Sequence, residues 1–282
     1  MTAREGIVRV VCVTYRPGPE LDDFAGSLAG SAATVELVIV DNSDDHSVAE
    51  RVAARHSATL RVPGGNVGYG AAANHGAAGA GQPWLVVANP DIVWHPGALD
   101  ALLDAGQRNP EAGALGPTVL NPDGSRYPSA RSLPSLRQGI GHALLSRVWP
   151  TNPWTRAYQD ATSADDERTV GWLSGACLLL RREAFEAVGG FDEGYFMFFE
   201  DLDLGARLGR AGWASVQVPA AEVTHVGGTS WRDRPAPMIR EHHRSAVRYL
   251  SRRYARWYHW PLRTALRAGL AVRQGVELRR AR

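Results

Sequence analysis

The stretch Trp84-Leu85-Val86-Val87-Ala88-Asn89-Pro90-Asp91 predicts more about the fold of this 282-residue chain than any other. Its five apolar residues form a short run that ends in turn formers, which is typical of a buried strand. The last three residues, Asn89-Pro90-Asp91, place an amide and a carboxylate at the end of that strand. Ligands of open parallel sheets bind beyond the carboxyl ends of the strands. We therefore expect a core strand with a candidate ligand site at its end.

Strand-like and helix-like segments alternate on both sides of this stretch. The expected strands are Ile7–Val13, Val35–Val40 and Thr59–Val62, and the expected helices are Leu21–Leu28, Ser47–Arg55, Tyr69–Ala80 and Pro96–Arg108. Ser47 and Glu50 predict a capping box, and Pro96 suits a first helical turn. The alternation predicts an α/β fold, a Rossmann-like, mainly parallel central sheet flanked by helices. Three polar strand ends, Thr14-Tyr15, Asp41-Asn42-Ser43 and Asn89-Pro90-Asp91, should then converge on one crevice.

The second half of the chain is less regular. Residues 121–170 are rich in Pro, Ser, Arg and Trp, which predicts long loops. Beyond them we expect a strand over Val170–Leu180, helices over Arg182–Val188 and Asp201–Ala211, and a strand over Ala214–Val218. From Met238 the pattern is helical, with a break at Pro261. We therefore expect one domain over residues 1–236, with halves of about 1–120 and 121–236, and a helical extension over 237–282.

The charge of the chain is unevenly distributed. The net charge is +2, yet residues 237–282 hold twelve arginines against two glutamates, a balance of +10 that leaves −8 for the rest. Such a segment predicts contact with an anionic surface, and Trp257, Tyr258 and Trp260 favour a membrane. Solvated helices are the alternative, and nucleic acid is not expected because no recognised motif is present. The chain contains neither an apolar stretch near 20 residues nor a secretory signal pattern, so we expect a cytoplasmic protein.

The turn at Asp91 is a candidate metal site. Mg²⁺ and Mn²⁺ commonly bind through one or two carboxylates together with substrate phosphates. A plain turn is the alternative, since Asn-Pro and Pro-Asp are common turn formers. His225 follows a strand and precedes a Gly-Gly turn, so it could reach such a site, although a lone histidine is more often structural. Cys12 and Cys177 lie in apolar runs and are expected to be buried free thiols.

The glycine-rich segment over residues 64–70 is a candidate phosphate-binding loop. Glycines allow close approach of the backbone to a ligand, and a helix N-terminus suits phosphate. Gly68-Tyr69-Gly70-Ala71-Ala72-Ala73 also matches the dinucleotide pattern G-x-G-x-x-A, so a nicotinamide-dependent oxidoreductase is a rival interpretation. Two points disfavour this rival. The pattern follows the third strand rather than the first, and it leaves everything after residue 170 unexplained.

Three carboxylates, Glu200, Asp201 and Asp203, lie beside an aromatic run over residues 196–199. Carboxylates in such surroundings are costly unless they are solvated, paired or used. A helix beginning here would stabilise one or two of them through its dipole, and Asp203 is expected to pair with Arg207 at i, i+4. A carboxylate bordered by aromatic rings could also serve as a general base.

Taken together, these segments resemble the family 2 glycosyltransferases of the GT-A fold. The resemblance covers about residues 7–231 in order. It is carried by Thr14-Tyr15, Val40-Asp41-Asn42-Ser43, Gly65 to Gly70 with Asn74, Asn89-Pro90-Asp91, Trp172-Leu173-Ser174-Gly175-Ala176, Gly189 to Glu193, Phe199 to Leu204 and His225-Val226-Gly227-Gly228. Asn-Pro-Asp looks like the rhamnosyltransferase branch. Further likeness to actinobacterial rhamnosyltransferases of cell-wall linker synthesis is carried by Ala114 to Pro117, Tyr127 to Arg131, Trp149 to Trp154 and Pro261 to Arg263.

The resemblance implies an inverting enzyme that moves L-rhamnose from dTDP-L-rhamnose to the 3-hydroxyl of N-acetylglucosamine on a polyprenyl diphosphate. It implies Mg²⁺ or Mn²⁺ as cofactor, held by Asp91 and His225, and Asp201 as general base. The implied donor-nucleotide residues are Thr14, Tyr15, Asp41, Asn66, Gly68, Tyr69, Asn74 and Asn89, and the implied acceptor residues are Trp172, Ser174, Gly175 and Glu200. Because Asn89 replaces the first carboxylate of the common Asp-x-Asp, Asp91 is expected to be the motif's only charged ligand.

The resemblance also implies a peripheral position on the inner face of the plasma membrane, and we note a homo-oligomer as a further expectation. Three alternatives stay open at this point. One is a related transferase that uses another polysaccharide acceptor. The second is the nicotinamide-dependent oxidoreductase, and the third is a protein that binds a sugar nucleotide without transferring the sugar.

Overall fold

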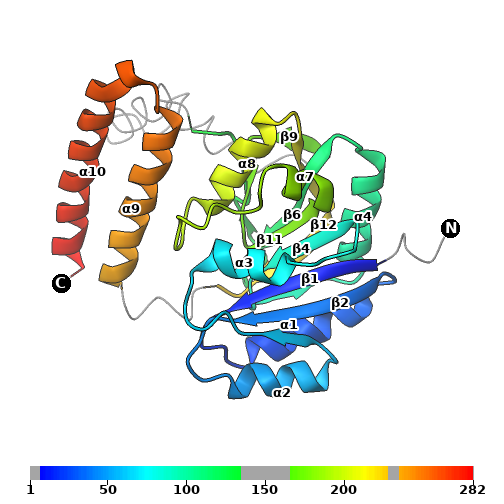
Figure 1. Ribbon diagram of the computed structural model, residues 1–282. Helices are drawn as coiled ribbons and strands as arrows, with labels where there is room; N and C mark the ends of the chain where they lie inside the picture. The colour runs from blue at the N-terminus through cyan, green and yellow to red at the C-terminus, as the bar shows by residue number, and fades with distance from the viewer. Residues whose placement is uncertain (1–6, 135–165, 228–234, 282) are drawn as a thin grey trace.

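The computed structural model describes residues 7–134, 166–227 and 235–281, and a twisted central sheet forms its core (Figure 1). The strand order is β3-β2-β1-β4-β11-β6-β12-β5. The first four strands are parallel: β1 (Ile7–Thr14), β2 (Thr34–Asp41), β3 (Thr59–Arg61) and β4 (Trp84–Ala88). The others are β11 (Cys177–Arg181), β6 (Ala112–Leu120), β12 (Ala214–His225) and β5 (Ile92–Trp94). Of these, β6 and β12 run in the direction of β4, and β11 and β5 run against it. The expected mainly parallel sheet is therefore confirmed.

Helices cover both faces of the sheet, because alternate strand residues point to opposite sides and both sides are apolar. On one face pack α1 (Glu20–Ser27), which continues as η1 (Leu28–Gly30), α2 (Ser47–Arg55) and α4 (Ala98–Arg108). On the other face pack α3 (Tyr69–Ala77), α7 (Arg182–Ala187) and α8 (Glu200–Arg210). Cys12 and Cys177 are buried free thiols in this core, as expected.

The basic segment forms a helical hairpin of α9 (Pro235–Arg253) and α10 (Trp260–Arg280), joined by η3 (Trp257–His259). The two helices lie side by side at one flank of the molecule (Figure 1). Pro261 lies in the first turn of α10, which agrees with the expected break. The hairpin is joined to the body through α9, whose Tyr249 is buried with Tyr195 and Leu202. No helix in the described ranges is long and apolar enough to cross a membrane.

Several expectations about individual elements were wrong. The apolar run over residues 170–180 is three short strands, β9 (Arg168–Val170), β10 (Trp172–Leu173) and β11, because the backbone at Gly171 and Ser174 hydrogen-bonds to Arg131 and Ser129 beside β8 (Ala130–Arg131). β10 pairs with β8 in a separate small sheet. β12 does not end at Val218 but continues to His225 through an irregularity.

β6 lies in the middle of the sheet, yet it was not predicted as a strand. It contains Gly113, Gly116 and Pro117, which weaken a strand pattern. The glycines are used for close packing: a side chain at Gly113 would meet Trp213, and one at Gly116 would meet Leu173. Its continuation, β7 (Arg126–Tyr127), falls inside the stretch that was expected to be loop, and residues 135–165 of that stretch lie outside the described residues.

Two helix starts also differ from expectation. Ser47 is the first helical residue of α2 and not its N-cap, and its N–H donates to Asp45 Oδ1 at 2.9 Å, so the capping box with Glu50 is absent. Pro96 belongs to a turn before α4, which begins at Ala98. At α2, Asp45 thus satisfies the Ser47 N–H, which the Glu50 side chain would have satisfied in the predicted capping box.

Candidate active site

The polar strand ends meet at the carboxyl edge of the sheet, as expected. Thr14 and Asp41 are register partners at the ends of β1 and β2, and Asn42 N–H donates to the Thr14 carbonyl at 2.9 Å. The next strand, β4, ends beside Cys12 of β1. Because β12 runs in the same direction as β4 and β11 runs against it, the end of β12 and the start of β11 lie at this same edge.

Asp91 and His225 face each other across this edge. His225 ends β12 opposite Ile92 of β5, and the Val226 N–H donates to the Asp91 carbonyl at 3.0 Å. His225 Nε2 lies 3.1 Å from Asp91 Oδ1 and 3.4 Å from Asn89 Nδ2. Although Asp91 Oδ1 is this close to the imidazole, the geometry is not that of a hydrogen bond, and the buried oxygen has no hydrogen-bond partner among the described residues.

This arrangement fits a hard divalent cation. A carboxylate oxygen without a donor, an imidazole nitrogen and a nearby amide are ligand types that Mg²⁺ and Mn²⁺ accept. Within the described part of the chain, no three His, Cys, Asp or Glu side chains gather closely enough to hold a metal by themselves. A cation held by Asp91 and His225 would thus need further oxygens from a substrate or from water.

Asp201 lies beside the same edge, at the start of α8. Its Oδ2 accepts the Gly175 N–H at 2.9 Å, and its Oδ1 accepts the Leu202 N–H at 2.7 Å. The neighbouring Ala176 carbonyl accepts the Asn89 N–H at 2.9 Å, so residues 175–176 connect the Asp201 carboxylate to the Asn89–Asp91 turn. The sequence placed these two segments in one site, and a short backbone link joins them in the structure.

Burial perturbs the two adjacent carboxyl groups, Glu200 and Asp201. Burial, followed by the charge of Asp201, raises the pKa of Glu200 to about 8, and Glu200 Oε2 is buried without a hydrogen-bond partner. Burial also raises the pKa of Asp201, but the backbone hydrogen bonds from Gly175 and Leu202 favour its ionised form. Of the pair, Asp201 is therefore the better stabilised as a carboxylate, because the Gly175 and Leu202 N–H groups donate to it.

At the nucleotide end of the edge, Thr14 and Asp41 are buried, and their expected contacts with the donor stay a prediction. Asp41 is fully buried: its Oδ1 accepts the N–H and hydroxyl of Ser43 at 3.0 and 2.5 Å, and its Oδ2 lies 2.8 Å from His46 Nδ1. The Asp41 carboxylate is not exposed, whereas the side chain of its partner His46 is 26% exposed. Sequence reasoning missed His46, although its position directly before a predicted helix was a usable signal. Thr14 is also buried, and its hydroxyl has no partner among the described residues.

The glycine-rich segment packs against the protein's own chain. A side chain at Gly68 would collide with the Phe196 carbonyl, and the Tyr69 N–H donates to that carbonyl at 2.9 Å. The N-terminus of α3 is thus partly covered, which removes the pyrophosphate site that the oxidoreductase interpretation required. Asn66 is exposed in the loop before α3, where its Oδ1 accepts the Gly68 N–H at 3.2 Å. The Tyr69 hydroxyl donates to the Gly175 carbonyl at 2.6 Å.

Asn74, whose expected contact with the donor stays a prediction, hydrogen-bonds to the protein's own chain. Its Oδ1 accepts the Phe191 N–H at 2.9 Å, and its Nδ2 donates to the Phe191 carbonyl at 2.9 Å and to Glu193 at 3.1 Å. The amide therefore ties α3 to the loop that precedes α8.

The expected acceptor residues lie next to Asp201. Trp172 packs against Gly205 of α8, with its ring 5.5 Å from the Arg131 guanidinium carbon. Ser174 donates its N–H to the Ser129 carbonyl at 2.7 Å. A side chain at Gly175 would press on Asp201. Tyr127, which the sequence analysis did not place in the site, lies edge-on to the His225 ring at 6.4 Å. Gly228 and Trp149–Trp154, which contributed to the resemblance, lie outside the described residues.

The fold and this edge together define a glycosyltransferase of the GT-A class. The chain belongs to family 2 of the glycosyltransferases, because the family model described as "Glycosyltransferase like family 2" matches residues 10–259. It is 48% identical, over 97% of its length and 93% of the relative's, to an N-acetylglucosaminyl-diphospho-decaprenol L-rhamnosyltransferase of Mycobacterium tuberculosis. It is 34% identical to rhamnosyltransferase WbbL of Escherichia coli over 44% of this chain and 45% of that protein.

Two solved structures share the fold at low sequence identity. One is GalNAc-T7 with UDP, GalNAc and Mn²⁺, with a TM-score of 0.61 and 14% identity over 85% of this chain and 47% of the other. The other is a mannosyltransferase of Pyrobaculum calidifontis with GDP-mannose and Mn²⁺, with a TM-score of 0.59 and 17% identity over 96% and 71%. The expected GT-A fold is confirmed by these likenesses.

Proposed function

We propose that this glycosyltransferase moves L-rhamnose from dTDP-L-rhamnose to the 3-hydroxyl of N-acetylglucosamine carried on a polyprenyl diphosphate, with inversion at the anomeric carbon. The main support is one observation: Asp201 and the Asp91–His225 pair lie at a single sheet edge, joined through residues 175–176. The name of the mycobacterial relative, over nearly the whole chain, supports the choice of sugar and acceptor.

The proposed transfer is a single displacement. Asp201 accepts the proton of the acceptor hydroxyl while that oxygen forms a bond to the anomeric carbon. The bond from the anomeric carbon to the diphosphate oxygen breaks, and dTDP leaves with the electron pair. The raised pKa of Asp201, which its burial causes, makes it a stronger base than an exposed aspartate. One carboxylate suffices, since no sugar becomes attached to the enzyme.

Asp91 and His225 would hold Mg²⁺ or Mn²⁺, and the Asn89 amide could add a neutral oxygen. When bound, the ion would offset the negative charge that grows on the departing diphosphate. The buried Asp91 Oδ1 supports this assignment, since it has no hydrogen-bond partner among the described residues and its neighbour at 3.1 Å is a second possible ligand, His225 Nε2. The presence of Mn²⁺ in both structural neighbours agrees with it.

Product analysis with several donors tests the proposal. The purified chain would be given Mn²⁺, a short-chain alkyl diphosphate of N-acetylglucosamine and, in separate reactions, dTDP-rhamnose, a UDP-sugar or a GDP-sugar. We expect a rhamnosylated product from dTDP-rhamnose only, with NMR showing the anomeric configuration opposite to that of the donor. Transfer from another donor, transfer to a different acceptor only, or donor binding without transfer would each contradict the proposal.

A membrane contact of the α9–α10 hairpin is the second part of the proposal. Its connecting turn exposes 80% of Trp257 and 61% of Trp260, and arginines are distributed along both helices. Aromatic rings at an interface and arginines near anionic head groups are a common combination in peripheral membrane proteins. Such a contact would bring the active site close to a lipid-linked acceptor.

Vesicle flotation tests this contact. We expect the full chain to float with vesicles that contain anionic lipid, and to float less at high salt because charges are screened. It should not float with neutral vesicles. A Trp257→Ala, Trp260→Ala double variant should float less while transfer to the short-chain acceptor stays unchanged. Equal flotation of the variant and the original chain would contradict a role for the aromatic turn.

A further inference from the structure

The loop over residues 191–199, here called the carboxylate loop, leads directly into Glu200 and Asp201. Its last two residues, Phe198 and Phe199, have φ values of +67° and +68°, and Phe199 is the N-cap of α8. Residues other than glycine rarely adopt this left-handed conformation, because it is strained when a side chain is present. Surrounding contacts must therefore hold the loop in the shape that sets the direction of Asp201.

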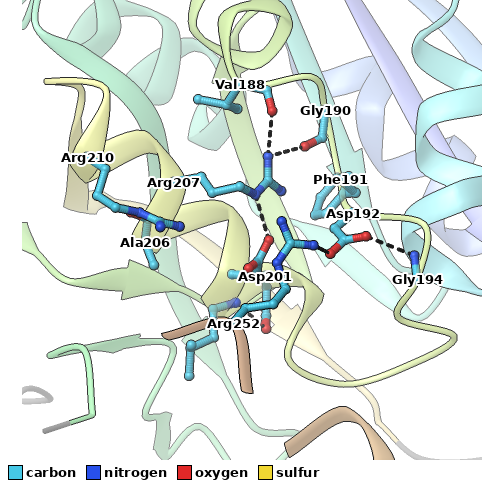
Figure 2. Close-up of polar contacts among 12 residues, drawn as sticks. Val188, Gly190, Phe191, Asp192, Gly194, Asp201, Ala206, Arg207, Arg210 and Arg252 are labelled. Carbon is cyan, nitrogen blue, oxygen red and sulfur yellow. Dashed lines mark hydrogen bonds and ion pairs between the residues drawn. The ribbon is translucent and has the colours of Figure 1, made fainter. Parts of the chain in front are cut away.

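Helix α9 supplies contacts along the carboxylate loop. Arg248 donates to both oxygens of Asp192, from Nη2 at 2.8 and 3.0 Å and from Nε at 3.2 Å, and Arg252 also contacts Asp192. Figure 2 shows Arg252 reaching Asp192. The Ser245 hydroxyl donates to the Met197 carbonyl at 2.8 Å, and Ser245 is only 2% exposed. A side chain at Gly194 would collide with the Arg248 guanidinium, so the loop and the arginine fit closely.

The strained end of the loop also contacts α9. The Phe199 ring lies 5.9 Å from the Tyr249 ring and 5.3 Å from His242, and Phe198 lies 5.5 Å from His242. Tyr249 is buried in the same cluster as Leu202, which is one residue beyond Asp201. These contacts reach α8 itself.

The opposite side of the loop is held by the body. Arg207 of α8 donates to the carbonyls of Val188 and Gly190, both at 2.7 Å (Figure 2). Arg207 also pairs with Asp203 at 2.6 Å, which confirms the pair expected from the sequence. On α3, the Tyr69 N–H bonds to the Phe196 carbonyl. The loop is therefore fixed between the body on one side and α9 on the other.

We infer that α9 is a positioning element of the active site, and that Arg248, through Asp192, keeps the carboxylate loop in the shape that aims Asp201 at the acceptor. The inference rests on the proposed function, since it takes Asp201 as the general base. Burial acts to raise the pKa of Asp192, but the hydrogen bonds from Arg248 and Gly194 and the charge of Arg252 outweigh it and lower the pKa overall. The Asp192 carboxylate is thus charged and available for this contact at neutral pH. The basic segment therefore has a role within the enzyme, and this role does not depend on any contact with lipid.

Kinetics of Arg248 variants in the full chain test the inference, with dTDP-rhamnose, Mn²⁺ and the short-chain acceptor. We expect Arg248→Ala to lower kcat about 10²-fold, because small misplacement of a reacting group is that costly, while the donor Kd from calorimetry stays within about twofold. Arg248→Lys should restore part of kcat, since lysine can pair with Asp192 without the two-pronged contact. Arg244→Ala is the matched control: Arg244 lies one turn earlier in α9, its side chain is 75% exposed, and its pair with Glu241 is 3.6 Å long. Equal kcat for Arg248→Ala and Arg244→Ala, or an equal loss of donor affinity and kcat, would overturn the inference.

Amide hydrogen exchange supplies a readout that needs no sugar transfer. We expect faster exchange over residues 192–203 in Arg248→Ala and unchanged exchange there in Arg244→Ala. If Arg248→Ala does not fold, Ser245→Ala removes one hydrogen bond from the same loop and should show the same pattern at smaller amplitude. An inactive unmodified chain would overturn the proposed function, whereas unchanged exchange in a folded Arg248→Ala or Ser245→Ala variant would overturn the hold of α9 on the loop.

Discussion

Two carboxylates at the same sheet edge, the fully buried Asp41 and the partly buried Asp91, have opposite surroundings. Asp41 ends β2 and receives hydrogen bonds from Ser43 and His46. Asp91 follows β4, and its Oδ1 is buried with no hydrogen-bond partner in the described ranges. The difference teaches that a strand-end aspartate in this fold has one of two uses. On one side of the edge, the carboxylate accepts hydrogen bonds from the protein itself. On the other side, a carboxylate oxygen has no hydrogen-bond partner and is available to a ligand.

The contrast extends along the edge. On the β1–β2 side, residues near the surface, such as His46, are held in place by a buried acid. On the β4–β12 side, the unpartnered Asp91 Oδ1 and Glu200 Oε2 lie near the hydrogen-bonded Asp201. Carboxyl oxygens without a hydrogen-bond partner thus lie on one side, whereas the oxygens without such a partner on the other side belong to the neutral Thr14 and Asn42. Four substitutions test this division.

Asp201→Asn should have the largest effect. An amide cannot accept the acceptor proton, so we expect kcat to fall about 10²- to 10⁴-fold, with unchanged calorimetric affinity for dTDP-rhamnose and Mn²⁺. Its neighbour Glu200→Gln serves as the control for general disturbance of the helix start. Near-normal turnover of Asp201→Asn would remove Asp201 as the base.

Asp91→Ala should have the next largest effect. Loss of the only carboxylate in the Asn89–Asp91 turn should weaken Mn²⁺-dependent donor binding by about 10- to 100-fold. The donor affinity of the isosteric Asp91→Asn variant should lie between those of Asp91→Ala and the unmodified chain. Calorimetry with and without Mn²⁺ measures the effect. If the donor affinity of Asp91→Ala depends on Mn²⁺ as much as before, the metal assignment is wrong.

Asp41→Asn should reduce stability and leave the metal dependence intact. Asparagine keeps the shape but accepts fewer hydrogen bonds from Ser43 and His46, so we expect the free energy of unfolding to fall by about 1 to 2 kcal/mol. Urea denaturation measures this loss. A variant of unchanged stability that binds donor poorly would show that Asp41 contacts the nucleotide directly, and would break the comparison with Asp91.

Glu200→Gln should have the smallest effect, visible as a pH dependence. The folded pKa of about 8 lies above the ordinary value of 4.5, so the fold favours protonated Glu200. Its stabilising contribution is complete below about pH 4.5 and is lost as the pH rises through about 8. We therefore expect the unmodified chain to lose stability relative to Glu200→Gln as the pH rises from about 4.5 to about 8. If the free energy of unfolding changed equally with pH in the unmodified chain and in Glu200→Gln, a buried, protonated Glu200 would be contradicted.

Local patterns predicted the first half of the fold well, because its strands are short apolar runs bounded by turn residues. The predicted strand over residues 84–88 agrees with β4, and Asp203 and Arg207 pair as their helical spacing predicted. β6 escaped prediction because its glycines and proline serve packing partners that are distant in sequence. The run over residues 170–180 was misread because an apolar pattern does not show which neighbouring strands will divide it.

For the site, the sequence by itself determined which chemical groups are present and that the strand ends bring them to one edge. Chain direction and strand alternation suffice for that, since both are local properties. Only the tertiary structure decided which of these groups are free to meet a ligand. Asp41, Gly68 and Asn74 have their contacts taken by residues 43–46, Phe196 and Phe191, whereas Asp91 Oδ1 stays open. The reason is physical: the free energy of a buried polar atom depends on the partners it finds in three dimensions, and those partners come from segments that no local pattern connects.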